Sequence, residues 1–155
     1  HEYFCSFLMQ LEEMFEHIIA LLRTDIEDQD ISVKLDIPDK LSAEIDEQQI
    51  EQVVINIIKN AIQALEEIDD ESHEKKLWIQ AKGKPDGGVS ITIKDNGPGI
   101  EEEALKKIFI PFFTTKKRGS GIGLSLSKQI MRKHGGNITA RSTINEGTEF
   151  TLKFS

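Results

Sequence analysis

The chain has 155 residues, which is enough for one domain with a sizeable hydrophobic core. With 38% hydrophobic and 30% charged residues, its composition is that of an ordinary soluble globular protein. The formal net charge of −8 argues against bulk nucleic-acid binding and against docking on an anionic membrane surface. The single cysteine, Cys5, excludes a framework of internal disulfide bonds and fits a reducing compartment.

The first residues carry no targeting signal. No apolar run approaches the roughly 20 residues that a membrane-spanning helix needs. The opening His1-Glu2-Tyr3-Phe4 has neither the basic nor the apolar region of a secretory signal peptide, and it lacks an initiator methionine. We therefore expect the chain to be a fragment of a longer protein.

The N-terminal third is predicted to form one helix followed by two strands. Between residues 7 and 28, apolar side chains recur at three- and four-residue steps, as in an amphipathic helix with one buried face. Residues 31–37 alternate between apolar and polar and are stopped by Pro38, which indicates a strand. A short strand is predicted at residues 42–45.

The next predicted helix carries two asparagines that need an explanation. Asp46 is its predicted N-cap, with Gln49 in the capping-box position, and its apolar spacing continues to about Ile68. Asn56 and Asn60 are four residues apart, so their side chains project from one face. Asparagine is a mediocre helix former. Either the pair lies on a solvated surface, or its amide oxygens face a hard cation or phosphates.

Two hairpins and two helices are predicted in the second half of the chain. The hairpin strands alternate between apolar and polar residues, and the second helix ends at Gly135-Gly136. In chain order the elements are strands 77–82 and 89–95, helices 101–107 and 124–134, and strands 137–143 and 148–154. His73, in a polar loop, and His134, at a helix end, are both expected to be solvated.

The stretch Asp95-Asn96-Gly97-Pro98-Gly99-Ile100 stands at the end of a predicted strand. Gly97 and Gly99 permit positive φ and leave no Cβ, so another group can approach the backbone closely. The carboxylate of Asp95 would then face whatever fills that space. Taken alone, the pattern fits a strand-ending turn capped by its own aspartate equally well.

A glycine-rich loop precedes the last predicted helix. Gly119, Gly121 and Gly123 alternate directly before it, where free backbone N–H groups and the helix dipole favour an anion such as phosphate. The basic run Lys116-Lys117-Arg118 lies beside them. Residues 108–115, just upstream, hold three aromatic residues within five positions, which indicates either a lid that docks by burying its rings or a plain hydrophobic plug.

Together these features predict a nucleotide site. A carboxylate accepts a hydrogen bond from an exocyclic amine, so Asp95 favours adenine over guanine. The two asparagines would hold Mg²⁺ against the phosphates, and the glycine loop with its three basic residues would cover them.

Four stretches resemble, in chain order, the N, G1, F and G2 boxes of the catalytic ATP-binding domain of bacterial sensor histidine kinases. They are Asn56-Ile57-Ile58-Lys59-Asn60-Ala61, Asp95-Asn96-Gly97-Pro98-Gly99-Ile100, Pro111-Phe112-Phe113-Thr114-Thr115-Lys116 and Gly119-Ser120-Gly121-Ile122-Gly123-Leu124. Residues 146–150 also resemble the last hairpin of that family. Four boxes in order at sensible spacing are far more specific than any one of them.

The resemblance implies a single catalytic domain over residues 1–155 with an α+β fold. This fold, the Bergerat fold, is a two-layer α/β sandwich in which a mixed, mostly antiparallel sheet carries about three helices on one face. A mobile ATP lid is implied at about residues 97–122.

The same resemblance assigns roles to individual residues. Asp95 would bind the adenine amine, directly or with a water that Thr148 shares. Asn60 would ligate Mg²⁺, with Asn56 near the metal or the phosphates, and these two asparagines are the catalytic candidates. The other residues implied to contact the nucleotide are Gly97, Gly99, Ile100, Thr114, Thr115, Lys116, Gly119, Ser120, Gly121, Ile122, Gly123 and Leu124.

Two positions depart from patterns of the wider family. Hydrolysing members carry a glutamate four residues before the metal-binding asparagine as the base for water, and here that position is Asn56. This favours phosphoryl transfer over hydrolysis. Many sensor kinases have a lysine three residues after the same asparagine, and here it is Gln63, which leaves phosphate binding to the lid cations.

The implied function is to bind ATP with Mg²⁺ and to transfer its γ-phosphoryl group to a histidine on the dimerisation domain of a two-component sensor kinase. The residues that begin at His1 do not form the phospho-accepting histidine motif of the family. We therefore expect the dimerisation domain to be absent from this chain and the chain to be inactive without it. A response regulator would be an indirect partner in the phosphorelay. The domain would be cytoplasmic, without nucleic-acid or membrane contacts, in a parent protein for which an inner-membrane anchor is left open.

Two other functions fit the same boxes. An anti-sigma-type serine kinase shares the fold and would act as a stand-alone chain on a protein serine. A nucleotide-sensing module would bind ATP without transferring phosphate, although the intact boxes count against it.

Overall fold

The computed structural model describes residues 7–114 and 123–154. Its elements are β1 (Phe7–Gln10), α1 (Leu11–Leu21), α2 (Arg23–Asp28), β2 (Ser32–Asp36), β3 (Ser42–Ile45), α3 (Glu47–Glu66), β4 (Lys76–Gly83), β5 (Val89–Asp95), α4 (Glu102–Leu105), α5 (Gly123–Lys133), β6 (Asn137–Thr143) and β7 (Gly147–Phe154). No helix in these ranges is long and apolar enough to cross a membrane.

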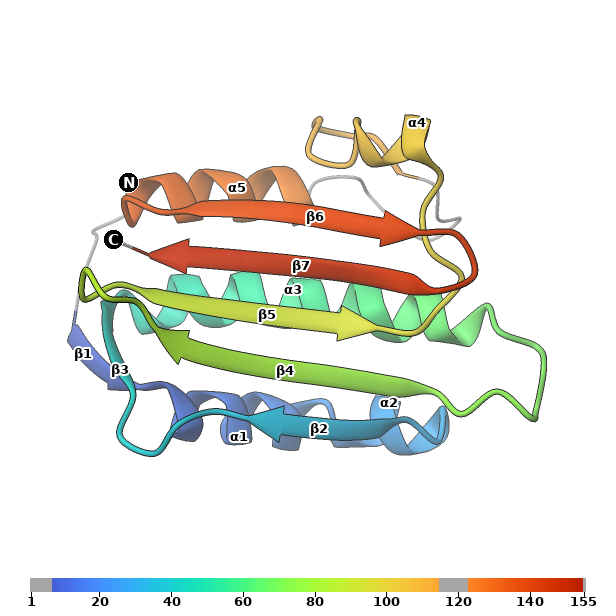
Figure 1. The fold of residues 1–155 in the computed structure, drawn as a ribbon, viewed down its shortest axis with the longest axis horizontal. Helices are drawn as coiled ribbons and strands as arrows, with labels where there is room; N and C mark the ends of the chain where they lie inside the picture. The colour runs from blue at the N-terminus through green and yellow to red at the C-terminus, as the bar shows by residue number, and fades with distance from the viewer. Residues whose placement is uncertain (1–6, 115–122, 155) are drawn as a thin grey trace.

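A five-stranded sheet forms one layer of the molecule and helices form the other. The strand order is β2-β4-β5-β7-β6, with β2 parallel to β4 and every other neighbouring pair antiparallel. Figure 1 shows α1, α3 and α5 lying behind the sheet, all on the same face. The predicted two-layer α+β fold, with a mixed, mostly antiparallel sheet and three helices on one face, is therefore confirmed.

The core lies between these two layers and follows directly from the sequence periodicities. On β4 and β5 every second side chain is buried, as a strand with one covered face requires. On α3 the buried residues recur at helical spacing and include Ile50, Val54, Ile57 and Leu65. Burying a side chain of this size contributes about 1.5–3 kcal/mol, so this shared apolar layer provides the main force that holds helices to sheet.

The prediction of one helix over residues 7–28 is wrong at both its start and its middle. Phe7–Gln10 is a strand, β1, which pairs antiparallel with β3 in a separate two-stranded sheet. The helix then breaks at Leu22, whose backbone angles are φ −100° and ψ 9°. Leu22 and Ile26 are still buried, so the apolar spacing predicted the covered face correctly but could not reveal the break or the pairing with β3.

The start of α3 is capped as predicted and is also held by the end of α5. The backbone N–H of Gln49 donates to Oδ1 of Asp46 at 3.2 Å, which is the N-cap bond. The backbone N–H of Asp46 donates to Nε2 of His134 at 3.0 Å, and Nδ1 of His134 lies 2.9 Å from the carbonyl oxygen of Ile130. The prediction of a solvated His134 is therefore wrong, because the ring is half-buried between the two helices.

Two residues of α1 provide a matched test of this packing. Phe15 has 0% of its surface exposed and Leu21 has 59% exposed. We expect Phe15→Ala to lower the free energy of unfolding by about 3–5 kcal/mol, because it removes a ring from the closed core. Leu21→Ala should change it by less than about 0.5 kcal/mol. Urea unfolding followed by circular dichroism measures both, and similar losses for the two variants would contradict the described docking of α1.

Candidate functional site

Asp95 ends the central strand of the sheet and is held there by its own turn. The residue is 3% exposed, and Oδ1 of its carboxylate accepts a hydrogen bond from the backbone N–H of Gly97 at 2.8 Å. Its side chain follows Ile91 and Ile93 along β5 and so points to the helix-covered face of the sheet. The carboxylate is thus fixed in a buried position at the edge of the helical layer.

A row of polar side chains extends from Asp95 across the neighbouring strands. Thr148 on β7 is the direct cross-strand partner of Asp95, and Ser142 on β6 is the partner of Thr148. Thr148 is 5% exposed, and its Oγ1 lies 2.9 Å from Oγ of Ser142. The backbone N–H of Ile100 donates to Oγ of Ser142 at 2.7 Å. Ser142, which the sequence did not single out, therefore ties the turn after β5 to β6.

The glycines of this turn are required because other parts of the chain come very close. A Cβ on Gly97 would lie 2.8 Å from Oδ1 of Asp95 and 3.3 Å from Cβ of Ala64 on α3. Gly99 has φ +80°, and a Cβ there would lie 2.4 Å from the carbonyl oxygen of Thr143. The predicted close approach is therefore present, and the approaching groups are the aspartate itself, α3 and the end of β6.

The loop before β4 and the first residue of β4 also hold this turn through hydrogen bonds. Oδ1 of Asn96 accepts from the backbone N–H of Lys76 at 2.8 Å, and Nδ2 donates to the carbonyl oxygen of Glu74 at 2.7 Å. Nε2 of His73 lies 2.9 Å from the carbonyl oxygen of Asn96. His73 is half-buried, so the prediction that it is solvated is wrong. A residue pattern gives no signal for such a contact because the loop is folded back by tertiary structure.

Within the same loop, Asp70 is ordered by Ser72. Oδ1 of Asp70 accepts from the hydroxyl of Ser72 at 2.6 Å and from its backbone N–H at 2.9 Å. These bonds stabilise the charged form and lower the pKa of the Asp70 carboxyl below its usual value.

One face of α3 connects the turn after β5 to the start of α5. Asn56, Asn60 and Ala64 follow one another at four-residue steps and therefore share a face. Ala64 lies against Gly97 at one end, and Nδ2 of Asn56 donates to Oγ of Ser127 at 3.3 Å at the other. Asn60 stands between them. Both asparagines are half-buried, which excludes the alternative that they lie on a fully solvated surface.

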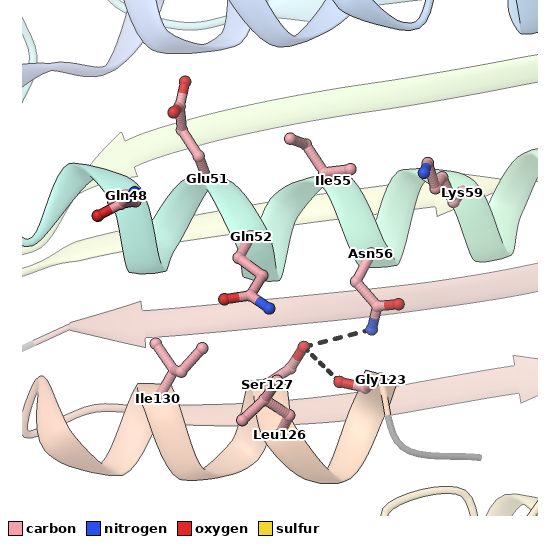
Figure 2. A pocket seen from close by; sticks show the side chains of 10 residues that line it. All are labelled: Gln48, Glu51, Gln52, Ile55, Asn56, Lys59, Gly123, Leu126, Ser127 and Ile130. Atoms are coloured by element: carbon pink, nitrogen blue, oxygen red, sulfur yellow. Dashed lines mark hydrogen bonds between the residues drawn. The ribbon is translucent and has the colours of Figure 1, made fainter. Parts of the chain in front are cut away.

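The contact between Asn56 and α5 is close. The hydroxyl of Ser127, itself 2% exposed, donates to the carbonyl oxygen of Gly123 at 2.8 Å and so accepts from Asn56. A Cβ on Gly123 would lie 2.3 Å from Oδ1 of Asn56. Figure 2 shows Asn56 of α3 opposite Gly123 and Ser127 of α5. The three residues are among those that line a groove of about 440 Å³ between the two helices. A side chain at position 123 would therefore displace the amide of Asn56 from its present position.

The remaining predicted site residues fall into two groups. Thr114 is exposed and Leu124 is half-buried, on either side of the undescribed segment. Thr115, Lys116, Gly119, Ser120, Gly121 and Ile122, together with most of the basic run and the central part of the predicted lid, lie outside the described residues. The predicted helix start at Leu124 agrees with α5, which begins at Gly123.

The chemistry available at this site is set by acceptors at one end and amides at the other. Asp95 and Thr148 lie at the sheet end, whereas Asn56 and Asn60 share one face of α3, and Asn56 contacts the start of α5. Within the described ranges, no group of three or more His, Cys, Asp or Glu residues is arranged to hold a metal ion. The expected Mg²⁺ site would use the amide oxygen of an asparagine in place of such a group. Amide oxygens are suitable ligands for a hard cation when phosphate oxygens complete the coordination shell.

Comparison with known proteins gives consistent matches over this region. The model of the family described as histidine kinase-, DNA gyrase B- and HSP90-like ATPases matches residues 45–155. The C4-dicarboxylate transport sensor protein DctB of Rhizobium meliloti is 34% identical over 143 residues, covering 92% of this chain and 22% of DctB. The signal transduction histidine-protein kinase AtoS of Escherichia coli is 36% identical over 149 residues, covering 93% of this chain and 23% of AtoS. The chain thus spans about a quarter of the length of these relatives.

Solved structures extend the match to the fold. The catalytic domain of histidine kinase ThkA, in a nucleotide-free form, has a TM-score of 0.84 and 32% identity, covering 97% of this chain and 95% of that domain. ThkA in complex with response regulator protein TrrA has a TM-score of 0.78 and 27% identity, covering 97% of this chain and 42% of that chain. The chain therefore belongs to the histidine kinase-, DNA gyrase B- and HSP90-like ATPase family and, within it, to the ATP-binding catalytic domains of bacterial sensor histidine kinases.

Proposed function

We propose that this chain binds ATP with Mg²⁺ and transfers the γ-phosphoryl group to a histidine on a separate dimerisation domain of its parent kinase. The observation that carries the proposal is the face of α3 formed by Asn56, Asn60 and Ala64. It begins at α5 and ends at the turn that fixes Asp95. Eight residues of helix span about 12 Å, which suits an extended triphosphate nucleotide with its base at one end and its phosphates at the other.

In this proposal the base is read at the sheet end. Asp95 accepts a hydrogen bond from the exocyclic amine of adenine, directly or through a water shared with Thr148. The N–H of Gly97 holds Oδ1 of the carboxylate in place, which reduces the ordering cost of binding at this group. Gly97, Gly99 and Ile100 form the turn beside the base.

The phosphates are proposed to lie toward the start of α5. Asn60 would supply an amide oxygen to Mg²⁺, and the ion would neutralise part of the charge of the phosphates. By the family resemblance, residues 114–116 and the glycines at 119, 121 and 123 would contact the phosphates, where the dipole of α5 favours negative charge. The bound ion would supply charge stabilisation, and the protein would supply position.

Transfer rather than hydrolysis is supported by Asn56. A carboxamide has no basic site at neutral pH, so it cannot take a proton from water as a glutamate would. Its Nδ2 is also engaged by Ser127. The nucleophile would be an imidazole nitrogen of the acceptor histidine, which attacks the γ-phosphorus while the bond to the bridging oxygen breaks and ADP leaves with that electron pair. The isolated chain would therefore not complete a reaction cycle.

The proposed partners follow from this division of labour. The direct partner is the dimerisation domain with its acceptor histidine, and the indirect partner is a response regulator. The related kinase ThkA has been solved with such a regulator, TrrA. We place the domain in the cytoplasm, without nucleic-acid or membrane contacts of its own.

A transfer assay tests the proposed function against both alternatives. The chain is mixed with a separately purified acceptor domain and ATP carrying a γ-³²P label. We expect acid-labile label on histidine of the acceptor domain. Acid-stable label on serine would favour the serine-kinase alternative, whereas ATP binding without any transfer would favour the nucleotide-sensing alternative.

The role of Asp95 is tested by Asp95→Asn. The change replaces one carboxylate oxygen, an acceptor, by an NH₂ group, which is a donor like the adenine amine that it would face. The hydrogen bond to the base is then weakened or lost, so we expect ATP binding to weaken by about 1–3 kcal/mol. Asp39→Asn, at an exposed loop position, is the control for the loss of one negative charge. Isothermal calorimetry measures both, and wild-type affinity in Asp95→Asn would remove the adenine assignment.

The role of Asn60 is tested by Asn60→Ala, with Gln63→Ala as an exposed control on the same helix. Because the variant loses the proposed ligand, most of the Mg²⁺ dependence of ATP binding should disappear. A magnesium titration at fixed ATP gives the result directly. If Asn60→Ala follows the wild-type titration curve, Asn60 is not the metal ligand.

A further inference from the structure

The hydroxyl of Ser142 has three polar neighbours. Its Oγ lies 2.7 Å from the backbone nitrogen of Ile100, 3.0 Å from the carbonyl oxygen of Gly147 and 2.9 Å from Oγ1 of Thr148. A serine hydroxyl can donate one hydrogen bond and accept two. Three neighbours therefore use its full capacity, and the direction of each bond can be worked out.

Two of the three directions are fixed by the chemistry of the partner. The backbone N–H of Ile100 can only donate, so Ser142 accepts from it. The carbonyl of Gly147 can only accept, so the single proton of Ser142 is directed to it. The third bond, between Ser142 and Thr148, must then use the proton of Thr148.

This assignment determines what Thr148 offers to a ligand. With its proton directed to Ser142, the Thr148 hydroxyl can only accept from any further group. Asp95, its cross-strand partner, is a carboxylate and also only accepts. The sheet end of the site is therefore lined by two groups of the same polarity, both buried to at least nine-tenths.

We propose that Ser142 is a specificity-determining residue: by taking the proton of Thr148, it makes this edge of the base site accept-only and selects purines with an amine at position 6 over purines with a carbonyl there. The inference rests on the proposed function, because it assumes that Asp95 and Thr148 read the base. It holds equally for a bridging water, since two acceptors would take both water protons and leave a lone pair facing the base.

The test compares ATP with inosine triphosphate, which differs from ATP by a carbonyl in place of the 6-amine and a proton on N1. Ser142→Ala frees the Thr148 hydroxyl to turn and donate to that carbonyl. We expect the preference for ATP over inosine triphosphate to fall by about tenfold, the scale of one redirected hydrogen bond. Ser142→Thr keeps the hydroxyl and should restore most of the preference.

A purely structural role for Ser142 predicts a different result. Loss of the bond to Ile100 would lower the affinity for both nucleotides, or the melting temperature, and leave their ratio unchanged. Thr139→Ala, at an exposed position of the same strand, is the matched control and should leave the ratio as in the wild type. An unchanged ratio in a folded Ser142→Ala variant would overturn the inference.

A second variant covers the case in which Ser142→Ala does not fold. Thr148→Val removes the hydroxyl itself while keeping its shape, so the preference should again fall, and a retained preference would equally overturn the inference. In the double variant the effect of Ser142→Ala on the ratio should vanish. If the wild-type chain binds neither nucleotide, the proposed function fails and the inference with it. If the wild type prefers ATP and the variants keep that preference, the inference alone fails.

Discussion

The hydrogen bond from the N–H of Gly97 to Oδ1 of Asp95 is the interaction on which the arrangement of the site depends. A buried carboxylate is costly unless it is hydrogen-bonded, and here the chain supplies the partner two residues later. That is possible only because β5 ends at Asp95 and the turn reverses tightly without a Cβ at position 97. Since β4 and β7 flank β5 on either side, the sheet that carries the core also fixes the position of this carboxylate.

Helix α3 has two faces with different roles: one packs against the sheet, and the other carries the polar side chains of the proposed site. Its apolar face, with Ile50, Val54 and Ile57 fully buried, holds it to the sheet. Its other face carries Asn56 and Asn60 between the start of α5 and the turn after β5. Asparagine inside a helix gives up stability relative to a better helix former, and α3 tolerates this because tertiary packing of the apolar face, more than helix propensity, determines whether it forms.

Sequence reasoning succeeded wherever a pattern was local. Periodicity predicted the strands of the five-stranded sheet and the buried face that continues from α1 through Leu22 to Ile26 of α2. The Asp46 cap was correct because a cap involves only three residues of separation. Sequence reasoning failed where distant segments meet. The pairing of β1 with β3 and the contacts of His73 and His134 depend on tertiary closure. Ser127 and Ser142 were missed for the same reason, since a lone serine has no pattern until its partners are known.

The direction of hydrogen bonds, more than the identity of the atoms, gives this site its proposed selectivity. A threonine hydroxyl can donate or accept, and Ser142 removes one of these options from Thr148. A carboxamide can likewise present oxygen or nitrogen, and Ser127 engages the nitrogen of Asn56, because the proton of Ser127 is directed to Gly123. Oδ1 of Asn56 then faces the start of α5, where the proposed phosphates lie. An amide held in this way can orient a phosphate or its metal ion but cannot deprotonate water. Transfer of the γ-phosphoryl group would therefore require a nucleophile that another domain supplies.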